Sequence, residues 1–198
     1  PEGGVWITAM PLFHVGGCST SQLGAFTHFG TFVMLTQFDE AFMLKTIAQE
    51  RANHLHAVPT MVIRLMEHPD RPSLDLSSLK TIMGGGSPVP ASMVQKVIDT
   101  FDCGYSITFG QTELCGIVSQ TFPEDTPVRQ AETVGTPSPQ VEVKIADPAT
   151  GAVKALGEPG EVWARGYQTM RGYFEMPEAS ASTVRPDGWL CMGDLATM

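Results

Sequence analysis

The sequence has few basic residues. It contains 12 Lys and Arg against 21 Asp and Glu, which gives a formal net charge of -9 at pH 7. Nucleic acids and anionic membranes are bound largely through basic surfaces. The composition therefore argues against either as the main partner, and any phosphate-binding site must be local.

Cysteine is also scarce, and long apolar runs are missing. Cys18, Cys103, Cys115 and Cys191 are scattered and form neither a Cys-x-x-Cys pair nor a zinc-like group, so we expect reduced thiols in a cytoplasmic protein. No apolar run approaches the roughly 18 residues that span a bilayer, and we expect no signal peptide. The chain starts at Pro1 rather than Met, and we expect it to be a piece of a longer protein.

The first 120 residues alternate between apolar runs that are typical of buried strands and amphipathic helical segments. This alternation predicts an α/β fold with a doubly wound, mostly parallel sheet. With 198 residues, 42% of them apolar, the chain can bury a core as one domain or two small ones. Strands are expected at 5–10, 31–35, 54–58, 79–83 and 105–109, and helices from about Ser19, after Asp39 as N-cap, from Pro59 to about Glu67, and after Pro90.

The composition changes near Thr121, where prolines become frequent and the helical period ends. Strict alternation at 141–145 and a second run at 160–165 predict strands separated by a turn at 147–151. We therefore expect an α/β subdomain at 1–120 and a β-rich, distorted barrel-like subdomain at 121–198.

Polar and glycine-rich segments follow several predicted strands. The most informative reads Phe109-Gly110-Gln111-Thr112-Glu113. Ligands of open parallel sheets bind outside the carboxyl ends of the strands, so Phe109 could present its ring to a base while Thr112 and Glu113 address phosphate and metal. Glu113 would be a hard oxygen ligand suited to Mg²⁺. The alternative is an ordinary turn with solvated polar residues.

Two other segments have competing interpretations. Gly84-Gly85-Gly86-Ser87 is neither a dinucleotide-binding fingerprint nor a nucleophile elbow, because Val89 stands where both need glycine. It remains either a flexible turn or a close approach of backbone to ligand. His54 and His56 share one face of a predicted strand, but no third metal ligand is near in sequence, so a structural role is expected.

The 109–113 segment resembles the Tyr-Gly-x-Thr-Glu core of the acyl-adenylate-forming superfamily, which includes acyl-CoA synthetases, luciferases and peptide-synthetase adenylation domains. Phe109 replaces the Tyr, which keeps the ring face and removes a hydroxyl. Four further segments resemble family motifs in the same order: 11–17, 84–88, 160–173 and 192–195. The last has Met192 where the family usually has Thr, and 160–173 is expected to be scaffold.

The resemblance implies a function and a set of site residues. An acyl-CoA synthetase would convert a carboxylic acid, with ATP and Mg²⁺, to acyl-adenylate and transfer the acyl group to coenzyme A. Thr112 and Glu113 would be catalytic, Glu113 as the Mg²⁺ ligand, and Asp194 would accept hydrogen bonds from the ribose. The remaining ATP or AMP site would comprise Gly84, Gly85, Gly86, Ser87, Phe109, Gly110, Gln111 and Thr112, and the acyl site His14, Gly16, Gly17 and Gly116.

The family's phosphate loop would precede residue 1, and its adenylation Lys would follow residue 198. We therefore expect the isolated chain to be inactive and to need the rest of its parent protein. The alternatives are a peptide-synthetase or luciferase-like enzyme, and a non-catalytic nucleotide-binding module.

Overall fold

A computed structural model describes residues 3–198. The chain forms two compact units, the first made of Pro1–Phe109 and Ser119–Thr136, the second of Gly110–Val118 and Pro137–Met198. Residues 110–118 thus belong to the second unit, although the chain on either side of them belongs to the first. The subdomain boundary predicted near Thr121 stays a prediction.

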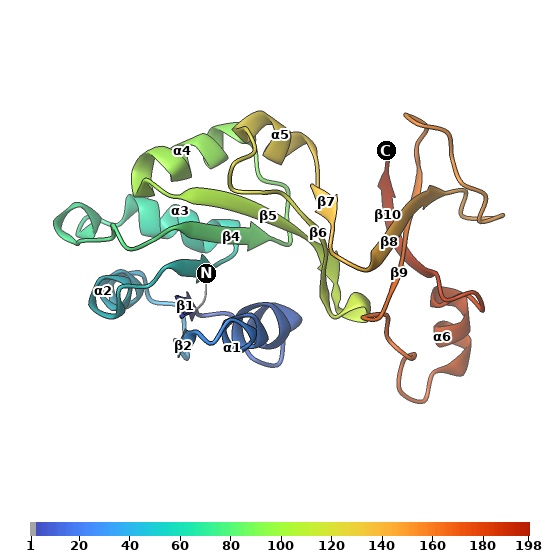
Figure 1. Cartoon of the computed structure of the whole chain (residues 1–198), viewed down its shortest axis with the longest axis horizontal. Coiled ribbons are helices and arrows are strands. Elements are labelled where there is room, and N and C mark those ends of the chain that lie inside the picture. Colours follow the sequence, from blue (N-terminus) through green and yellow to red (C-terminus); the bar gives the residue numbers. More distant parts are fainter. Residues whose placement is uncertain (1–2) are drawn as a thin grey trace. The chain divides into compact units, whose positions relative to one another are not determined.

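A seven-stranded sheet has the order β2-β1-β3-β4-β5-β6-β7 (Figure 1). The pairs β1–β2, β1–β3, β3–β4 and β4–β5 are all parallel, so the predicted mostly parallel α/β sheet is confirmed. The strands are β1 (Val5–Thr8), β2 (Thr31–Met34), β3 (His54–His56), β4 (Thr81–Gly85), β5 (Gly104–Gln111), β6 (Gly116–Gln120) and β7 (Thr136–Pro137).

The helices begin where local chemistry favours them. The Asp39 carboxylate accepts a hydrogen bond from Phe42 N at 2.8 Å and caps the first turn of α2. Pro59 occupies the first turn of α3, where its missing N–H costs nothing. The helical elements linked to this sheet are the π-helix η1 (Gly16–Leu23), α1 (Gly24–Thr27), α2 (Glu40–Glu50), α3 (Pro59–Glu67), the 3-10 turn η2 (Arg71–Ser73), α4 (Ala91–Phe101) and α5 (Pro127–Glu132).

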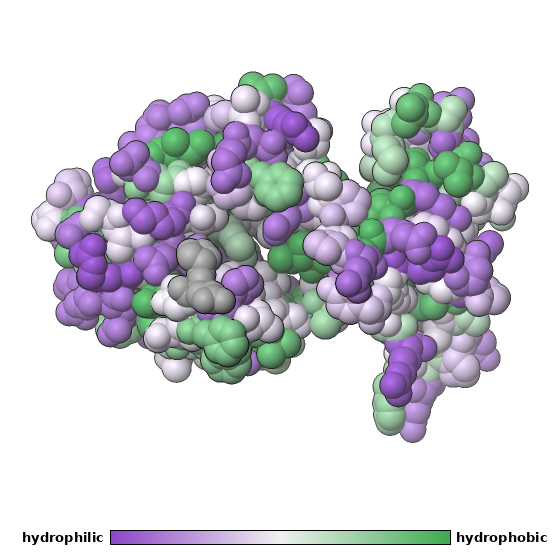
Figure 2. Space-filling model, viewed as in Figure 1, coloured by the Kyte–Doolittle hydropathy of each residue, from purple (hydrophilic) through white to green (hydrophobic). Residues whose placement is uncertain are grey.

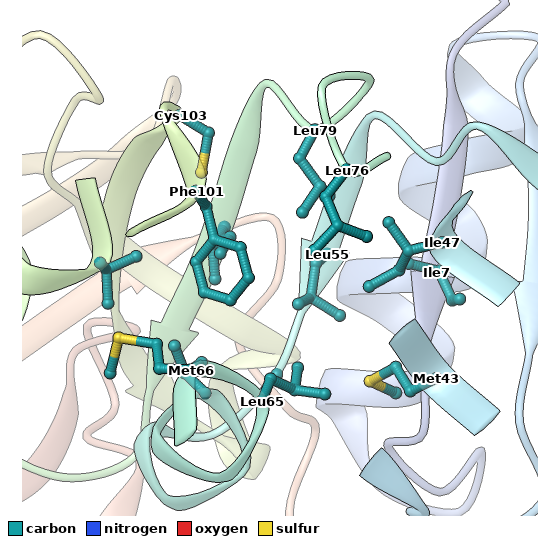
Figure 3. Close-up of a cluster of buried hydrophobic side chains, with 14 of the residues drawn as sticks. Ile7, Met43, Ile47, Leu55, Leu65, Met66, Leu76, Leu79, Phe101 and Cys103 are labelled. Carbon is teal, nitrogen blue, oxygen red and sulfur yellow. The ribbon is translucent and has the colours of Figure 1, made fainter. Parts of the chain in front are cut away.

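The hydrophobic core lies between the sheet and these helices (Figure 3). Ile7 and Leu55 come from neighbouring strands and are almost completely buried, as are Met43 and Ile47 of α2 and Leu65 of α3. The apolar spacing of the helices, three to four residues, places these side chains on one face of each helix. The core therefore fixes the strands whose ends carry the candidate site.

The second unit contains a three-stranded antiparallel sheet in the order β10-β9-β8. Lys144 Nζ contacts two indole rings, 4.6 Å from the centroid of Trp163 in β9 and 4.5 Å from that of Trp189, which directly precedes β10. Such cation–π contacts stabilise the packing of the buried Trp163 ring against its neighbours. Its elements are η3 (Thr112–Leu114), β8 (Val141–Ala146), β9 (Gly160–Gly166), α6 (Pro177–Thr183) and β10 (Leu190–Ala196).

Several element boundaries differ from the sequence predictions, and the strands predicted at 5–10, 31–35 and 54–58 end one or two residues earlier. The strand predicted at 79–83 runs from Thr81 to Gly85, and the strand predicted at 105–109 continues to Gln111. Glycine explains the first extension, because a Cβ on Gly85 would lie 2.3 Å from Thr108 O of the paired strand. The helix predicted from Ser19 begins earlier, at Gly16, and its first eight residues are a π-helix.

The surface of the first unit carries apolar side chains near η1 and α1. Figure 2 shows hydrophobic residues at the surface in the region where Figure 1 places α1. Leu23, Phe26 and Phe29 of this region are 52%, 54% and 84% exposed. Among residues 3–198, no helix is both long enough and apolar enough to cross a membrane.

Candidate active site

In the first unit, three candidate segments lie at one edge of the sheet. β1, β4 and β5 point in the same direction, because each adjacent pair from β1 through β3 and β4 to β5 is parallel. The chain after Thr8, the glycines that end β4, and Phe109 near the end of β5 therefore all lie at the carboxyl edge. This edge is where open α/β sheets bind ligands.

The segment after β1 is held in place by the backbone around His14. Gly16 N donates to His14 Nδ1 at 3.0 Å, and Gly17 N and Cys18 N donate to His14 O at 3.0 and 3.1 Å. Because Nδ1 accepts a hydrogen bond, the neutral imidazole carries its proton on Nε2. His14 is exposed, so this N–H is available to a ligand.

Gly16 and Gly17 are buried, and the space left by their missing side chains is largely filled by the protein. A Cβ on Gly17 would lie 2.3 Å from Pro11 O, and a Cβ on Gly16 would lie 3.1 Å from Met10 Cε and 3.3 Å from His56 Cε1. These glycines therefore let the chain pack tightly against itself at the start of η1.

His56 supports this segment and was assigned only a structural role from the sequence. Its Nδ1 lies 2.8 Å from Ser21 Oγ and 3.1 Å from Gly16 O, and Ser21 Oγ donates to the same carbonyl at 2.8 Å. Burial lowers the pKa of His56 from 6.5 to about 4, with a smaller lowering from the charge of His14 and an opposing effect of the Gly16 hydrogen bond. A neutral imidazole thus links β3 to η1.

The other histidine of this strand, His54, packs on Trp6 with ring centroids 4.8 Å apart. Burial is the main cause that lowers its pKa. Within residues 3–198, no three His, Cys, Asp or Glu side chains are grouped so that they could hold a metal ion. The pairing of His54 with Trp6 is a packing role.

The glycine segment ends β4 in close contact with β5. A Cβ on Gly84 would lie 2.1 Å from Tyr105 Oη, and Thr108 Oγ1 donates to Gly84 O at 3.1 Å. Gly86 has φ +80° with open space around its Cα, and Ser87 is exposed. At the carboxyl edge of the sheet, this segment therefore exposes mainly backbone atoms, because three of its four residues have no side chain.

Phe109 lies one residue beyond the last paired position of β4 and β5, Gly85 with Thr108. Its side chain is half-buried. The next residue, Gly110, belongs to the second unit, where a Cβ would lie 1.7 Å from Gly116 O. The chain just before the η3 turn and the chain just after it can therefore lie this close together only because residue 110 is glycine.

In the second unit, Gln111 precedes the 3-10 turn of Thr112, Glu113 and Leu114. Leu114 is buried, whereas Thr112 is exposed and Glu113 is half-buried. The turn closes with Cys115 at φ 55° and Gly116 at φ 114°. The buried Leu114 anchors the turn, so that the Thr112 hydroxyl remains accessible to a ligand.

Two contacts orient Glu113, and both come from the segment that follows β9. Tyr173 Oη donates to Glu113 Oε1 at 2.8 Å, and Met170 N donates to Glu113 O at 2.8 Å. The carboxylate is the first cause that raises the pKa of the Tyr173 phenol, which keeps the phenol protonated as a donor. In residues 3–198, no basic side chain forms an ion pair with Glu113.

Asp194 is exposed in β10, at an irregularity of the β9–β10 pairing between Cys191 and Leu195. Gly193 has φ +80°, and its N–H donates to Glu161 Oε1 at 3.0 Å. The other oxygen of Glu161 accepts from Trp163 Nε1 at 2.7 Å. Glu161 thus fixes the backbone bulge that presents the Asp194 carboxylate.

Tyr173 and Glu161 are the site-supporting residues that sequence reasoning missed. Both lie in the Gly160–Tyr173 segment that was predicted to be scaffold. Tyr173 is sixty residues from Glu113 in sequence. The spacing of residues within a helix or strand cannot predict a contact between positions so far apart. The only sequence signal was the family-like spacing of the segment itself.

Comparison with known proteins identifies the class. Residues 1–174 match the family described as AMP-binding enzyme. The match covers most of the chain and includes four of the five motif segments, those at 11–17, 84–88, 109–113 and 160–173. The chain therefore belongs to the AMP-binding enzyme family, and the resemblance predicted from the motifs is confirmed.

Named relatives include YngI of Bacillus subtilis (strain 168), which is 37% identical over 190 residues, and human mitochondrial medium-chain acyl-CoA ligase ACSF2, which is 31% identical over 200 residues. These alignments cover 96% and 100% of this chain but 35% and 32% of the relatives. The chain thus spans about a third of their length.

Solved structures show the same fold. The amide bond synthetase McbA from Marinactinospora thermotolerans has a TM-score of 0.88 and 33% identity, with 100% of this chain and 40% of McbA covered. O-succinylbenzoate coenzyme A synthetase MenE from Bacillus subtilis, in complex with ATP and magnesium ion, has a TM-score of 0.87 and 27% identity, with the same coverage. These neighbours differ in the acceptor that their names imply.

Proposed function

We propose that the parent protein of this chain activates a carboxylic acid with ATP and Mg²⁺ to form an acyl-adenylate, and then transfers the acyl group to coenzyme A. The reaction class is an AMP-forming acid–thiol ligase. The acid's oxygen attacks the α-phosphorus of ATP and pyrophosphate leaves; the thiol then attacks the acyl carbon, and AMP leaves.

The observation that carries this proposal is the Glu113 carboxylate on its short 3-10 turn. It stands in the Phe-Gly-Gln-Thr-Glu segment of a chain that belongs to the AMP-binding enzyme family. No proton needs to be removed from the attacking acid, which is already ionised at neutral pH. An oriented acidic group in the segment proposed to bind the phosphates is therefore better explained as a metal ligand than as a general base.

The donor set at Glu113 fits Mg²⁺, which binds proteins through one or two carboxylates and keeps waters and substrate phosphates as its other ligands. Glu113 is half-buried with one oxygen bonded to Tyr173, and among the described residues it has no basic ion-pair partner. When bound, Mg²⁺ would offset the charge of the phosphates during the displacement.

The other residues would bind and orient the substrates. The exposed Thr112 hydroxyl can donate to a phosphate oxygen, and the Phe109 ring can stack on adenine. Asp194, an acceptor with two oxygens, suits the two ribose hydroxyls. His14 would donate from Nε2 to the carboxylate of the acid. The backbone of residues 84–87 would border the adenine, Gly110 and Gln111 would complete the nucleotide segment, and Gly16, Gly17 and Gly116 would belong to the acyl segment.

A second candidate is amide formation, which is favoured by the likeness to McbA at a TM-score of 0.88. The first half-reaction would be the same, and an amine would replace the thiol. A peptide-synthetase or luciferase-like reaction would share this half-reaction too. These candidates differ only in the fate of the acyl-adenylate.

The test uses the full-length parent protein and a panel of carboxylic acids. Acid-dependent exchange of labelled pyrophosphate into ATP would establish adenylation, and its absence with every acid would favour a non-catalytic nucleotide-binding module. Coenzyme A or an amine is then added to the activated acid, and the product is identified by mass spectrometry. Thioester formation supports the ligase; amide formation without thioester replaces it with the second candidate.

A further inference from the structure

The segment from Gly160 to Tyr173 has a role beyond scaffold in the second unit. After β9 it contacts Glu113 of the η3 turn twice and the neighbouring strand β6 once. Tyr173 Oη donates to the Glu113 carboxylate and Met170 N to the Glu113 carbonyl, both at 2.8 Å, and Gln168 Nε2 donates to Ile117 O at 2.9 Å. Both the main chain and the side chain of Glu113 are therefore held from the same segment.

Tyr173 is itself held in place. Its N–H donates to Ser180 Oγ of α6 at 2.8 Å, and Ser180 Oγ also donates to Met176 O at 2.7 Å. Gly172 has φ +146°, and a Cβ there would lie 2.8 Å from Ser180 Oγ. The position before Tyr173 thus requires glycine, and the phenol projects from a backbone with little freedom.

The consequence for Glu113 is a loss of side-chain freedom. A free Glu side chain rotates about three bonds, and holding it in one geometry costs conformational entropy. The Tyr173 hydroxyl fixes Oε1, which leaves Oε2 as the oxygen that can face a cation. Carboxylates that bind metals are commonly oriented by such hydrogen bonds, and loss of the orienting group weakens metal binding by about 10- to 100-fold.

We propose that Tyr173 is a positioning residue that orients Glu113 for Mg²⁺·ATP. The inference rests on the proposed function, because it takes Glu113 as the metal ligand. The Tyr173 phenol keeps its proton and holds the carboxylate. Its contribution is therefore to metal affinity in the adenylation half-reaction.

The test compares Tyr173→Phe with the wild-type full-length parent, since Phe keeps the ring and removes only the hydroxyl. Tyr167→Phe is the matched control, because Tyr167 lies on the same segment and is 76% exposed. Binding of Mn²⁺·ATP is followed by electron paramagnetic resonance, as Mn²⁺ accepts the same oxygen ligands as Mg²⁺. Binding of ATP in EDTA is measured in parallel by calorimetry.

Tyr173→Phe should weaken Mn²⁺·ATP binding about 10- to 100-fold and raise the half-saturating Mg²⁺ concentration for adenylation by a similar factor. Binding of metal-free ATP and the rate at saturating Mg²⁺ should stay within about twofold of wild type. Tyr167→Phe should match wild type in all four measurements. Equal values for Tyr173→Phe and Tyr167→Phe would overturn the inference.

A double-mutant cycle separates positioning from a general effect on the fold. In a Glu113→Gln background, adding Tyr173→Phe should change Mn²⁺·ATP binding by less than about twofold, because the group that it orients is no longer a carboxylate. Additive losses, or parallel losses of metal-free ATP binding, would mean that Tyr173 only stabilises the unit. Absence of Mn²⁺-dependent ATP binding in the wild type would instead refute the proposed function.

Discussion

The substitution His56→Gln should remove much of the acid sensitivity of the first unit. His56 is buried, with 8% of its surface exposed, and bridges Ser21 and Gly16 of η1. Burial lowers its pKa in the folded chain to about 4 from 6.5. At pH values between about 4 and 6.5, His56 is therefore protonated in the unfolded chain and neutral in the folded chain.

The sign and size of the effect follow by linkage. Because the folded chain keeps His56 uncharged, the free energy of unfolding has its full value above pH 6.5. It decreases as the pH falls from 6.5 toward about 4. Between pH 7 and pH 5 the loss is about 2 kcal/mol, and the limit at lower pH is about 3 kcal/mol. His54 changes stability in the same direction because its pKa is also lowered, so only a comparison with the variant isolates His56.

The assay is urea unfolding of wild type and His56→Gln at pH 7 and pH 5, with the slope of the transition checked at each pH. Gln keeps a polar group that can bond to Ser21 and the Gly16 carbonyl, so the variant should lose about 2 kcal/mol less than wild type between the two pH values. An equal loss in both proteins would refute the reasoning. So would an imidazole titration by NMR that places His56 near 6.5.

Further substitutions test other parts of the structure. Gly84→Ala should destabilise the chain by about 1 to 3 kcal/mol, because the added Cβ would overlap the Tyr105 hydroxyl, and Tyr105→Phe should rescue part of this loss in thermal unfolding. Asp39→Ala should cost about 1 kcal/mol in urea unfolding through loss of the cap on Phe42 N. In the full-length parent, Asp194→Ala should weaken ATP binding by about 1.5 to 3 kcal/mol without a change in acyl preference; changed acyl selectivity with unchanged ATP affinity would contradict the ribose role.

The repeating part of the fold was predictable because its signals are local. The cap at Asp39, the proline at the start of α3 and the strand alternation at 141–145 each act within a few residues, and the structure confirms all three. The predicted strand ends were less accurate where glycines, which usually indicate a turn, continue the strand instead. Strand β4 continues through Gly84 and Gly85 because a Cβ there would overlap the Tyr105 hydroxyl and Thr108 O of the paired strand.

The candidate site was predictable only where a motif carries it. Glu113 was proposed as a site residue from its neighbours in sequence, whereas its contact with Tyr173 joins residues sixty positions apart. Likewise, the link from His56 to Ser21 crosses from a strand to the π-helix, and no sequence pattern signals a π-helix at residues 16–23. These contacts arise from tertiary packing, so they become visible only in the folded chain.

The most direct test of the account measures the two half-reactions of the full-length parent separately in Glu113→Gln, across a Mg²⁺ titration. Gln keeps the shape of the side chain and removes its charge. If about 3 kcal/mol of metal-assisted stabilisation is lost, adenylation should fall about 100-fold and recover in part at high Mg²⁺. Thioester formation from supplied acyl-adenylate, which has no pyrophosphate to release, should fall much less. Equal losses in both half-reactions, with no dependence on Mg²⁺, would show that Glu113 supports the fold rather than the metal.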